Sequence, residues 1–398
     1  MGSRIVAGAL SAALVLSSAP RAGDASRAHA DVSPSPGASP VAKASAGIDE
    51  ISSRLFRDGK IVGLVVGIVD HGQQKVLSFG EVEKGSGRKS DASTIFDLGA
   101  VTTTFTATIL AAFAERGLVR LDDPLQKYAP AGVTVPTEQG QPITLLELAT
   151  HTSGLPTVRK MLAQRGGSGP RHARREKTVF ADLDGIQLVR PPGQQFAPTT
   201  LDYVLLADTL ARLAKLDYPA LLASEVCSRL GMNDTGVEVG AAQQARHAQG
   251  YAPDGTPVPH LRSLPLSLGA TDLHSTLDDL LKFLRWNMGL IDQSRSLLPI
   301  LQQKRHETSR PGIDIGLAWR IKDDGRHPVV FSNGIRPGFR AVIAFVPDTQ
   351  TGVVILANTS VGGVEQAAMR ILSALNGLPE GAPLPAESTG GEDDTDEP

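Results

Sequence analysis

Strand-like segments lie near both ends of this chain of 398 residues, and helical patterns occupy most of the stretch between them. Near the start, residues 61–69 (IVGLVVGIV) form a β-branched run, which a turn separates from a second strand at 75–79. Near the end, strand patterns recur at 329–331, 341–345 and 353–356. Because strands at the two ends need one another as partners, we predict an α+β fold. It would be an antiparallel sheet built from both chain ends and flanked by helices, with a mainly helical insertion at about 99–283.

The two ends of the chain differ in composition from its middle. A short apolar run followed by an A-x-A pattern predicts a signal peptide over residues 1–30, and this run is shorter than the roughly 20 residues of a membrane span. Residues 31–46, rich in Pro, Ser and Ala, predict a flexible linker, and the acidic stretch 378–398 predicts a solvated, disordered tail. The folded domain is therefore expected at 47–377, beginning with a helix at 48–56. We expect an exported protein, periplasmic or extracellular, with no transmembrane segment in the mature chain.

Composition narrows the classes of partner. The chain is 41% apolar and 20% charged, which is typical of a globular protein. Its formal net charge of −3 and its aromatic content of 4% offer neither a basic surface nor a stacking platform for nucleic acid. The single cysteine, Cys227, excludes an internal disulfide and a thiolate metal cluster, and the nine histidines lack the spacing of metal ligands. We therefore predict no metal and no cofactor.

Eight stretches of the folded part form a further pattern. In chain order they are residues 96–105 (FDLGAVTTTF), 117–124 (GLVRLDDP), 143–156 (ITLLELATHTSGLP), 192–193 (PG), 230–235 (LGMNDT), 275–283 (STLDDLLKF), 316–319 (GLAW) and 334–339 (GIRPGF). Together they resemble the serine β-lactamase and D-alanyl-D-alanine carboxypeptidase (penicillin-binding) superfamily, most closely its class C-like branch. The resemblance covers about residues 49–372 and implies the β-lactamase/transpeptidase-like fold.

The first chemical element of that family is S-x-x-K at the start of a helix, where the lysine can take the proton of the nucleophilic serine. The resemblance, with its register fixed by Gly99 and Phe105, puts Ala100 at the serine position and Thr103 at the lysine position. Alanine has no heteroatom that can attack a carbonyl. A threonine hydroxyl is neutral and is no useful proton acceptor near neutral pH. The acyl-enzyme route is therefore predicted to be closed.

The other two chemical elements are altered as well. In the family's Y-x-N element, the resemblance gives Pro198 for the tyrosine and Thr200 for the asparagine. The K/H-T-G element of the pocket strand becomes Ser332, Asn333 and Gly334, so that the lysine or histidine is lost while the glycine remains. A glycine is needed where a substrate backbone lies against a strand edge. Five chemical positions thus differ within otherwise retained motifs.

These substitutions predict a pseudoenzyme: an exported, non-catalytic homologue of serine β-lactamase and carboxypeptidase-type hydrolases. Its pocket would bind a peptidoglycan-like peptide or another small ligand, or its surface a protein partner. Asn333 and Gly334 are candidate binding residues. Arg336 and Arg340, which follow them, are further candidates because a guanidinium can hold a ligand carboxylate through two hydrogen bonds.

Two alternatives stay open at this point. The first is an active carboxypeptidase, esterase or β-lactamase with a displaced nucleophile, for which Ser86 in the sequence SGRK and Ser153 in HTSG are the residues to consider. In the family the HTSG stretch is structural. The second is a structural component of the cell envelope that is held by its disordered ends.

Overall fold

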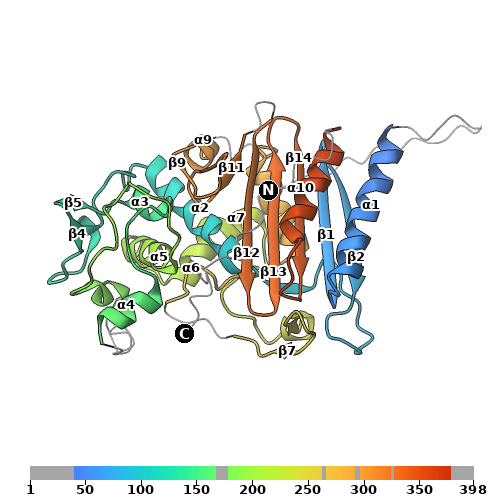
Figure 1. Ribbon diagram of the computed structural model, residues 1–398, viewed down its shortest axis with the longest axis horizontal. Coiled ribbons are helices and arrows are strands. Elements are labelled where there is room, and N and C mark those ends of the chain that lie inside the picture. The colour runs from blue at the N-terminus through green and yellow to red at the C-terminus, as the bar shows by residue number, and fades with distance from the viewer. Residues whose placement is uncertain (1–39, 167–177, 262–265, 292–295, 324–326, 378–398) are drawn as a thin grey trace, which may run out of the picture. The chain divides into compact units, whose positions relative to one another are not determined.

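An eight-stranded antiparallel sheet forms the centre of the fold (Figure 1), and its strands come from both ends of the folded chain. The strand order is β2–β1–β14–β13–β12–β11–β10–β9. Strand β1 (Gly63–Asp70), from the start of the chain, pairs along its length with β14 (Thr351–Ala357), from its end. Helices flank the sheet on both faces. The predicted α+β fold class, with a sheet built from both chain ends, is therefore confirmed.

The computed structural model describes residues 40–166, 178–261, 266–291, 296–323 and 327–377. The predicted signal peptide and acidic tail lie outside the described residues, and so does the predicted linker up to residue 39.

The remaining strands complete the main sheet or form three small two-stranded ladders. Those of the main sheet are β2 (Gln73–Gly80), β9 (His306–Glu307), β10 (Ile313–Ile315), β11 (Arg320–Lys322), β12 (Val329–Arg336) and β13 (Phe339–Val346). The small ladders pair β3 (Ile95–Asp97) with β8 (His274–Thr276), β4 (Thr137–Glu138) with β5 (Gln141–Pro142), and β6 (Gly250–Tyr251) with β7 (Pro257–Val258).

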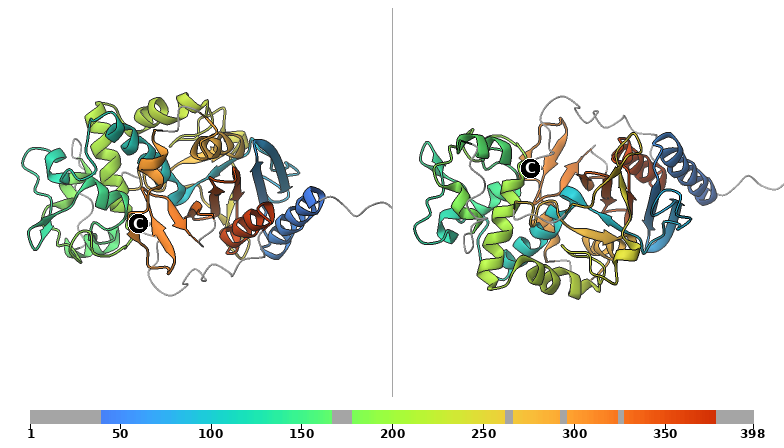
Figure 2. Two further views of the ribbon diagram at one scale, coloured as in Figure 1. Left: turned by 90° about the horizontal axis from the view of Figure 1, so that it is seen from above. Right: turned by 90° about the horizontal axis from the view of Figure 1, so that it is seen from below.

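Both faces of the sheet are buried. Helices α1 (Pro40–Asp58) and α10 (Val364–Leu375) lie side by side on one face (Figure 2), and α8 (Leu277–Asn287) packs on the other. Alternate residues of β1 point to opposite faces of the sheet and join different cores. Its even-numbered apolar side chains join the core under α1 and α10, whereas Val65 and Val69 join the core that contains α8. Burial on both sides explains why this strand is almost continuously apolar in sequence.

The first helix is longer than predicted. We expected a linker up to residue 46 and a helix at 48–56, but α1 already begins at Pro40. Proline is favoured at the first position of a helix, where its missing N–H is no loss. The following residues 41–46 (VAKASA) include three alanines and a lysine, which favour a helix. The linker prediction was therefore wrong for residues 40–46.

Helices dominate the chain between β3 and β9. The longer ones are α2 (Thr102–Glu115) and α5 (Thr200–Ala214), which pack against each other and are largely buried. The shorter ones are α3 (Leu145–Ala149), α4 (Val158–Gln164), α6 (Tyr218–Leu222), α7 (Ser228–Leu230) and α9 (Leu298–Gln302), the 3-10 helices η1 (Gly99–Val101), η2 (Leu125–Tyr128), η4 (Val179–Leu183) and η6 (Gln244–Arg246), and the π-helix η5 (Ala223–Cys227).

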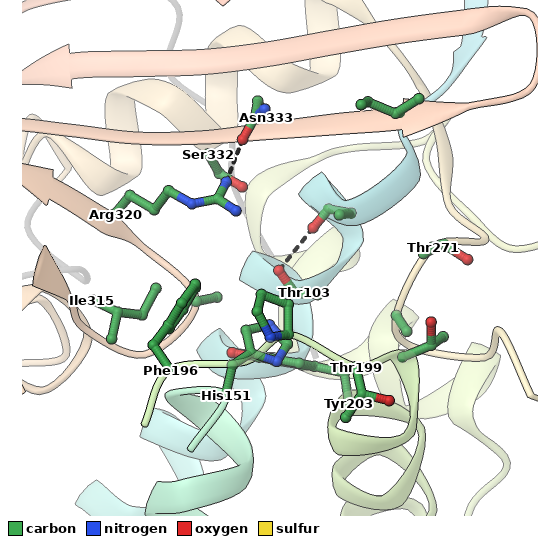
Figure 3. A pocket seen from close by; sticks show the side chains of 16 residues that line it. Thr103, His151, Phe196, Thr199, Tyr203, Thr271, Ile315, Arg320, Ser332 and Asn333 are labelled. Atoms are coloured by element: carbon green, nitrogen blue, oxygen red, sulfur yellow. Dashed lines mark hydrogen bonds between the residues drawn. The ribbon is translucent and has the colours of Figure 1, made fainter. Parts of the chain in front are cut away.

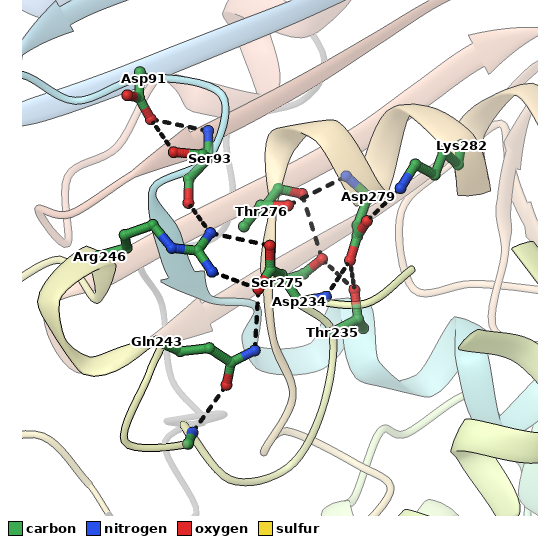
Figure 4. A network of polar contacts seen from close by, with 11 residues as sticks. Asp91, Ser93, Asp234, Thr235, Gln243, Arg246, Ser275, Thr276, Asp279 and Lys282 are labelled. Carbon is green, nitrogen blue, oxygen red and sulfur yellow. Dashed lines mark hydrogen bonds and ion pairs between the residues drawn. The ribbon is translucent and has the colours of Figure 1, made fainter. Parts of the chain in front are cut away.

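Two of the family-like stretches are joined by a buried carboxylate (Figure 4). Asp279, in the first turn of α8, accepts hydrogen bonds from the backbone N–H of Asp234 at 2.8 Å and from the hydroxyl of Thr235 at 3.0 Å. The ammonium of Lys282 lies 2.8 Å from the same carboxylate. Arg246 extends the network by pairing with Asp234 at 2.6 Å. We call these residues the Asp279 network. It ties the LGMNDT loop to the start of α8.

Candidate functional site

The start of helix α2 is pressed against strand β12 at two glycines. Gly99, in the turn that leads into α2, adopts a positive φ of 53°. A Cβ on Gly99 would overlap the carbonyl oxygen of Ile335, and a Cβ on Gly334 would overlap the carbonyl oxygen of Leu98. Only glycine permits so close an approach of two backbones. The main chain itself therefore fixes the distance between β12 and Ala100.

A pocket opens beside this contact, between β12, the start of α2 and the start of α5 (Figure 3). The five positions at which the resemblance predicts lost chemistry all line it, and so does Asn333. These five are Ala100, Thr103, Pro198, Thr200 and Ser332. The fold thus brings together three separated parts of the sequence that the resemblance had assigned to one site.

The hydroxyl of Thr103 is engaged within its own helix. Its Oγ1 donates a hydrogen bond of 2.7 Å to the carbonyl of Ala100, which Figure 3 shows at the pocket wall. Thr104 likewise donates to the carbonyl of Val101 at 2.8 Å. Threonines of a helix often bond in this way to the preceding turn. The hydroxyl of Thr103 therefore adds polarity to the pocket, but a neutral hydroxyl does not supply a base there.

The start of α5 forms the opposite wall. Thr199 is its N-cap, and its hydroxyl accepts the N–H of Leu201 and donates to the carbonyl of Pro156 at 3.1 Å. Pro198 and Thr200 flank this cap and reach the pocket. A proline side chain has neither a donor nor an acceptor, so the position assigned to the proton-shuttling tyrosine contributes only apolar surface.

Strand β12 presents a partly open edge to the pocket. Strand β11 pairs with β12 only at residues 329–331, whereas β13 pairs with β12 from Val330 to Arg336. Beyond this pairing, Ser332, Asn333 and Ile335 line the pocket, whereas Gly334 abuts the turn before α2. An edge of this kind offers backbone donors and acceptors to an extended peptide.

Arg320 is a pocket residue that sequence analysis missed. It lies on β11, lines the pocket and donates a hydrogen bond to Oδ1 of Asn333 (Figure 3). Its guanidinium therefore brings a permanent positive charge to the wall at Ser332, where the resemblance predicts a lysine or histidine. A signal was available, because Arg320 directly follows the GLAW stretch that carried part of the resemblance. Finding it required the pairing of β11 with β12, which sequence alone did not give.

Arg336 and Arg340, which we predicted as ligand-binding candidates, do not line this pocket. Arg336 is 4% exposed, donates to the carbonyl of Thr271 at 2.6 Å and lies 3.5 Å from a carboxylate oxygen of Asp97. It is a buried ion-pair residue because its strand face is covered by β3. Arg340 borders a separate small cavity next to the start of α10, together with Asn333 and Gly334.

His151 and Asp202 form a pair at the pocket. The Nδ1 of His151, a pocket-lining residue, lies 2.8 Å from the carboxylate of Asp202, which is completely buried. Burial raises the pKa of Asp202 above its usual value, although hydrogen bonds from His151 and Ser153 oppose this. Ser153 donates to the other oxygen of Asp202 at 2.5 Å and is 1% exposed. These contacts support the structural interpretation of HTSG and give no support to Ser153 as a displaced nucleophile.

Ser86, the other serine considered, lies in an exposed turn outside the pocket. Its hydroxyl donates to the carbonyl of Glu83 at 2.7 Å and accepts the N–H of Arg88 at 3.2 Å. Lys89 pairs with Glu81 at 3.8 Å instead of facing Ser86. The SGRK sequence therefore lacks the helical geometry that S-x-x-K chemistry needs.

Three further properties concern the reactivity of the cysteine, metal binding and membrane crossing. Cys227 is buried, and this burial raises the pKa of its thiol to about 12. Among the described side chains, no group of three or more His, Cys, Asp or Glu is arranged to hold a metal ion. Of the helices in the described ranges, none has both the length and the apolar character that crossing a bilayer demands.

A sheet built from both chain ends, with a pocket between one of its strands and the start of a buried helix, defines the β-lactamase/transpeptidase-like class of proteins. The chain belongs to the Beta-lactamase family, which its sequence matches over residues 44–376.

Individual relatives agree with this assignment. The chain is 27% identical over 332 residues to the D-alanyl-D-alanine-carboxypeptidase/endopeptidase AmpH of Escherichia coli K12, covering 79% of this chain and 83% of that protein. It is 27% identical to a Beta-lactamase of Pseudomonas fluorescens over 83% of this chain and 98% of that protein. The solved Beta-lactamase/D-alanine Carboxypeptidase of Yersinia pestis, complexed with citrate, superposes with a TM-score of 0.71 at 26% identity, covering 83% of this chain and 97% of that one.

Proposed function

We propose that this protein is a non-catalytic member of the Beta-lactamase family that binds a ligand with a carboxylate group in the pocket between β12 and α2. One observation carries the proposal. The five positions that the resemblance assigns to acylation chemistry hold alanine, threonine, proline, threonine and serine, and all five line the same pocket. The altered positions are therefore the chemical ones, within a scaffold that keeps the family fold.

Loss of turnover follows from elementary chemistry. Acyl transfer needs a nucleophile on the pocket wall and a base that takes its proton. Ala100 offers a methyl group, and the hydroxyl of Thr103 is bonded to the carbonyl of Ala100. Removal of a nucleophilic serine alone costs on the order of 10⁶-fold in turnover in subtilisin. The changes at Pro198 and Ser332 remove further polar groups that would support the reaction.

Binding is supported by what the pocket keeps. Arg320 supplies a guanidinium, whose planar donors match a carboxylate. The edge of β12 at Ser332 and Asn333, which β11 leaves unpaired, offers backbone groups to an extended chain. Ile335, 39% exposed, and Phe196 add apolar surface. A short peptide with a free C-terminus, such as a cell-wall peptide that ends in D-alanine, has all the complementary groups. The carboxypeptidase named among the relatives acts on D-alanyl-D-alanine, which supports this ligand class.

Calorimetric titration with a peptide ending in D-alanyl-D-alanine tests the binding. We expect Arg320→Met to weaken it by about 10- to 100-fold, since a hydrogen-bonded charged contact contributes about 1.5–3 kcal/mol. A peptide with an amidated C-terminus should bind the unaltered protein as weakly. Arg340→Met is the matched control, because Arg340 is an arginine of the neighbouring strand outside the pocket. Equal affinity of the two peptides would contradict the role of Arg320.

Incubation of the pure protein with a fluorescent penicillin tests the absence of catalysis. We expect no covalent labelling of the unaltered chain under conditions that label an active relative completely. A labelled band at the mass of this protein would contradict the proposal and would establish the alternative of an active hydrolase.

Export belongs to the same proposal. The signal peptide at residues 1–30 and the acidic tail at 378–398 stay predictions. Fractionation of cells that express the full chain should place the protein outside the cytoplasm, and a chain without residues 1–30 should remain inside. Deletion of 379–398 tests whether the tail holds the protein in the cell envelope. If that deletion alone releases it, the alternative of a structural envelope component gains support.

A further inference from the structure

A group of histidines lies beneath the pocket wall and takes no part in the proposed binding. Its members are His247, His260 and His274 with Asp97 and Arg336, and we call it the His247 cluster. Asp97 on β3 and His274 on β8 are direct cross-strand partners, and Arg336 ends β12. The cluster therefore joins three parts of the fold that meet next to Ala100.

His247 stands at the centre of the cluster. Its Nε2 lies 3.1 Å from a carboxylate oxygen of Asp97. The ring of His260 lies on one side, with a centroid distance of 4.1 Å and an angle of 30° between the ring planes. Phe339 is nearly parallel to His247, with ring centroids 6.2 Å apart. His247 is 9% exposed, so its stacked ring is largely withdrawn from water.

His274 is the most deeply buried of the three histidines. It is 3% exposed, and its Nε2 is buried without a hydrogen-bond partner among the described residues. Burial lowers the pKa of His274 to about 4, although Asp97 and Asp234 oppose this, and His247 and Arg336 lower the pKa further. His274 is therefore neutral at neutral pH.

We propose that the His247 cluster is a pH-sensitive clasp, which holds segment 257–261 against the domain at neutral pH and releases it on acidification. The segment carries His260 and is exposed over most of its length. Its described contacts with the domain include the stack on His247 and a hydrogen bond of 2.6 Å from the side chain of Gln249 to the carbonyl of Val258. Loss of the stack therefore removes one of the contacts that hold it.

The direction of the effect follows from charge. Two imidazole rings with centroids 4.1 Å apart repel each other strongly when both are positively charged. Asp97 is a single carboxylate and already pairs with Arg336. Desolvation lowers the pKa of His260, and His247 lowers it further, while Asp97 partly compensates. A released His260 would regain its ordinary pKa. The open form consequently binds protons more readily, and falling pH favours it.

The clasp adjoins the pocket through two hydrogen bonds. Arg336 holds the carbonyl of Thr271, which lines the pocket, at 2.6 Å. The backbone N–H of Leu98 donates to the carbonyl of Leu273 at 2.8 Å, one residue after Asp97 and two before Ala100. A change of charge in the cluster thus acts directly behind the pocket wall.

Hydrogen exchange of the ligand-free protein tests the clasp, and its result does not depend on whether the pocket binds anything. At about pH 5.5, we expect amides of residues 252–261 to exchange severalfold faster than at about pH 7.5, after correction for the intrinsic rate, because the open form binds protons more readily. His260→Phe keeps an aromatic ring for the stack but cannot titrate, so the pH dependence should vanish in this variant. His306→Phe, which changes a histidine on β9, should retain it.

Either of two results would overturn the clasp. The corrected exchange rates of the unaltered protein could be equal at the two pH values, or His260→Phe could show the same pH dependence as the unaltered chain. Imidazole NMR titration gives a second test, which needs no variant. The pKa of His260 should lie below its ordinary value, whereas titration at the ordinary value of about 6.5 would contradict the stack.

Discussion

The Asp279 network and the pocket are both built from family-like sequence stretches, but the network is rich in polar contacts and the pocket is poor in reactive groups. In the network, the carboxylate of Asp279 receives three polar partners between 2.8 and 3.0 Å. In the pocket, the positions of the nucleophile and of the shuttling tyrosine hold Ala100 and Pro198. The network holds the fold through polar contacts, whereas the pocket positions that the resemblance assigns to acyl transfer hold none of the groups which that reaction uses.

Side chains that stabilise the fold and side chains that perform a reaction differ in what their replacement costs. Removal of a buried carboxylate deprives its donors of a charged acceptor, so substitution of Asp279 is expected to destabilise the domain. A catalytic side chain faces a pocket and water, and its replacement strands no buried partner. Catalytic groups are even commonly held at some cost in stability. The comparison therefore shows that retention of the fold implies no retention of the reaction.

Removal of the network carboxylate should have the largest effect. We expect Asp279→Ala to lower the free energy of unfolding by about 3 kcal/mol, since the N–H of Asp234 and the hydroxyl of Thr235 lose a charged and buried acceptor. Urea denaturation measures this loss. Asp278→Ala is the matched control, because Asp278 is exposed on the same helical turn. Equal stability of the two variants would break the comparison.

His274 lies between the two regions in sequence. Thr271, which lines the pocket, precedes it, and Ser275, which bonds Thr235 of the Asp279 network, follows it. Its folded pKa of about 4 is below the unfolded value of 6.5, so the stability from keeping it neutral is present above about pH 6.5 and declines as the pH falls toward 4. We expect His274→Leu to reduce the loss of stability between these two pH values by about 2–3 kcal/mol. Urea midpoints at both pH values measure it, and an unchanged acid slope would contradict the assignment.

The contact between Gly99 and Gly334 should be sensitive to any added side chain. Gly334→Ala forces a Cβ onto the carbonyl oxygen of Leu98, and we expect a loss of about 1–3 kcal/mol in unfolding free energy. Gly362→Ala, where a Cβ would meet nothing within 4 Å, should change stability by less than about 0.5 kcal/mol. If Gly334→Ala were as mild as its control, β12 would not be held by this contact.

Restoration of the lost pair should have the smallest effect on stability and a clear effect on chemistry. Ala100→Ser with Thr103→Lys changes pocket-lining positions, and we expect the unfolding free energy of the single Ala100→Ser variant to change by less than about 0.5 kcal/mol. The double variant should gain slow covalent labelling by a fluorescent penicillin. Absence of labelling in a folded double variant would show that Pro198, Thr200 and Ser332 also need to be restored.

Sequence reasoning reached the fold and the altered positions because both depend on local patterns. The β-branched runs predicted β1 and the terminal strands, and the register of the motifs placed Ala100 and Ser332 in one pocket. Arg320 was missed because its position depends on the pairing of β11 with β12. Arg336 was misjudged because alternation along β12 does not reveal which face β3 covers. These errors concern contacts between elements, which composition and periodicity do not encode.

The contact between Gly99 and Gly334 has one further consequence. Because main-chain atoms set the spacing between β12 and the start of α2, substitution of side chains around the pocket leaves that spacing unchanged. The chemistry of the pocket can therefore change one residue at a time without a change of fold. For a protein engineer, the same property makes the five altered positions a set of places where new functional groups can be installed in a preformed site.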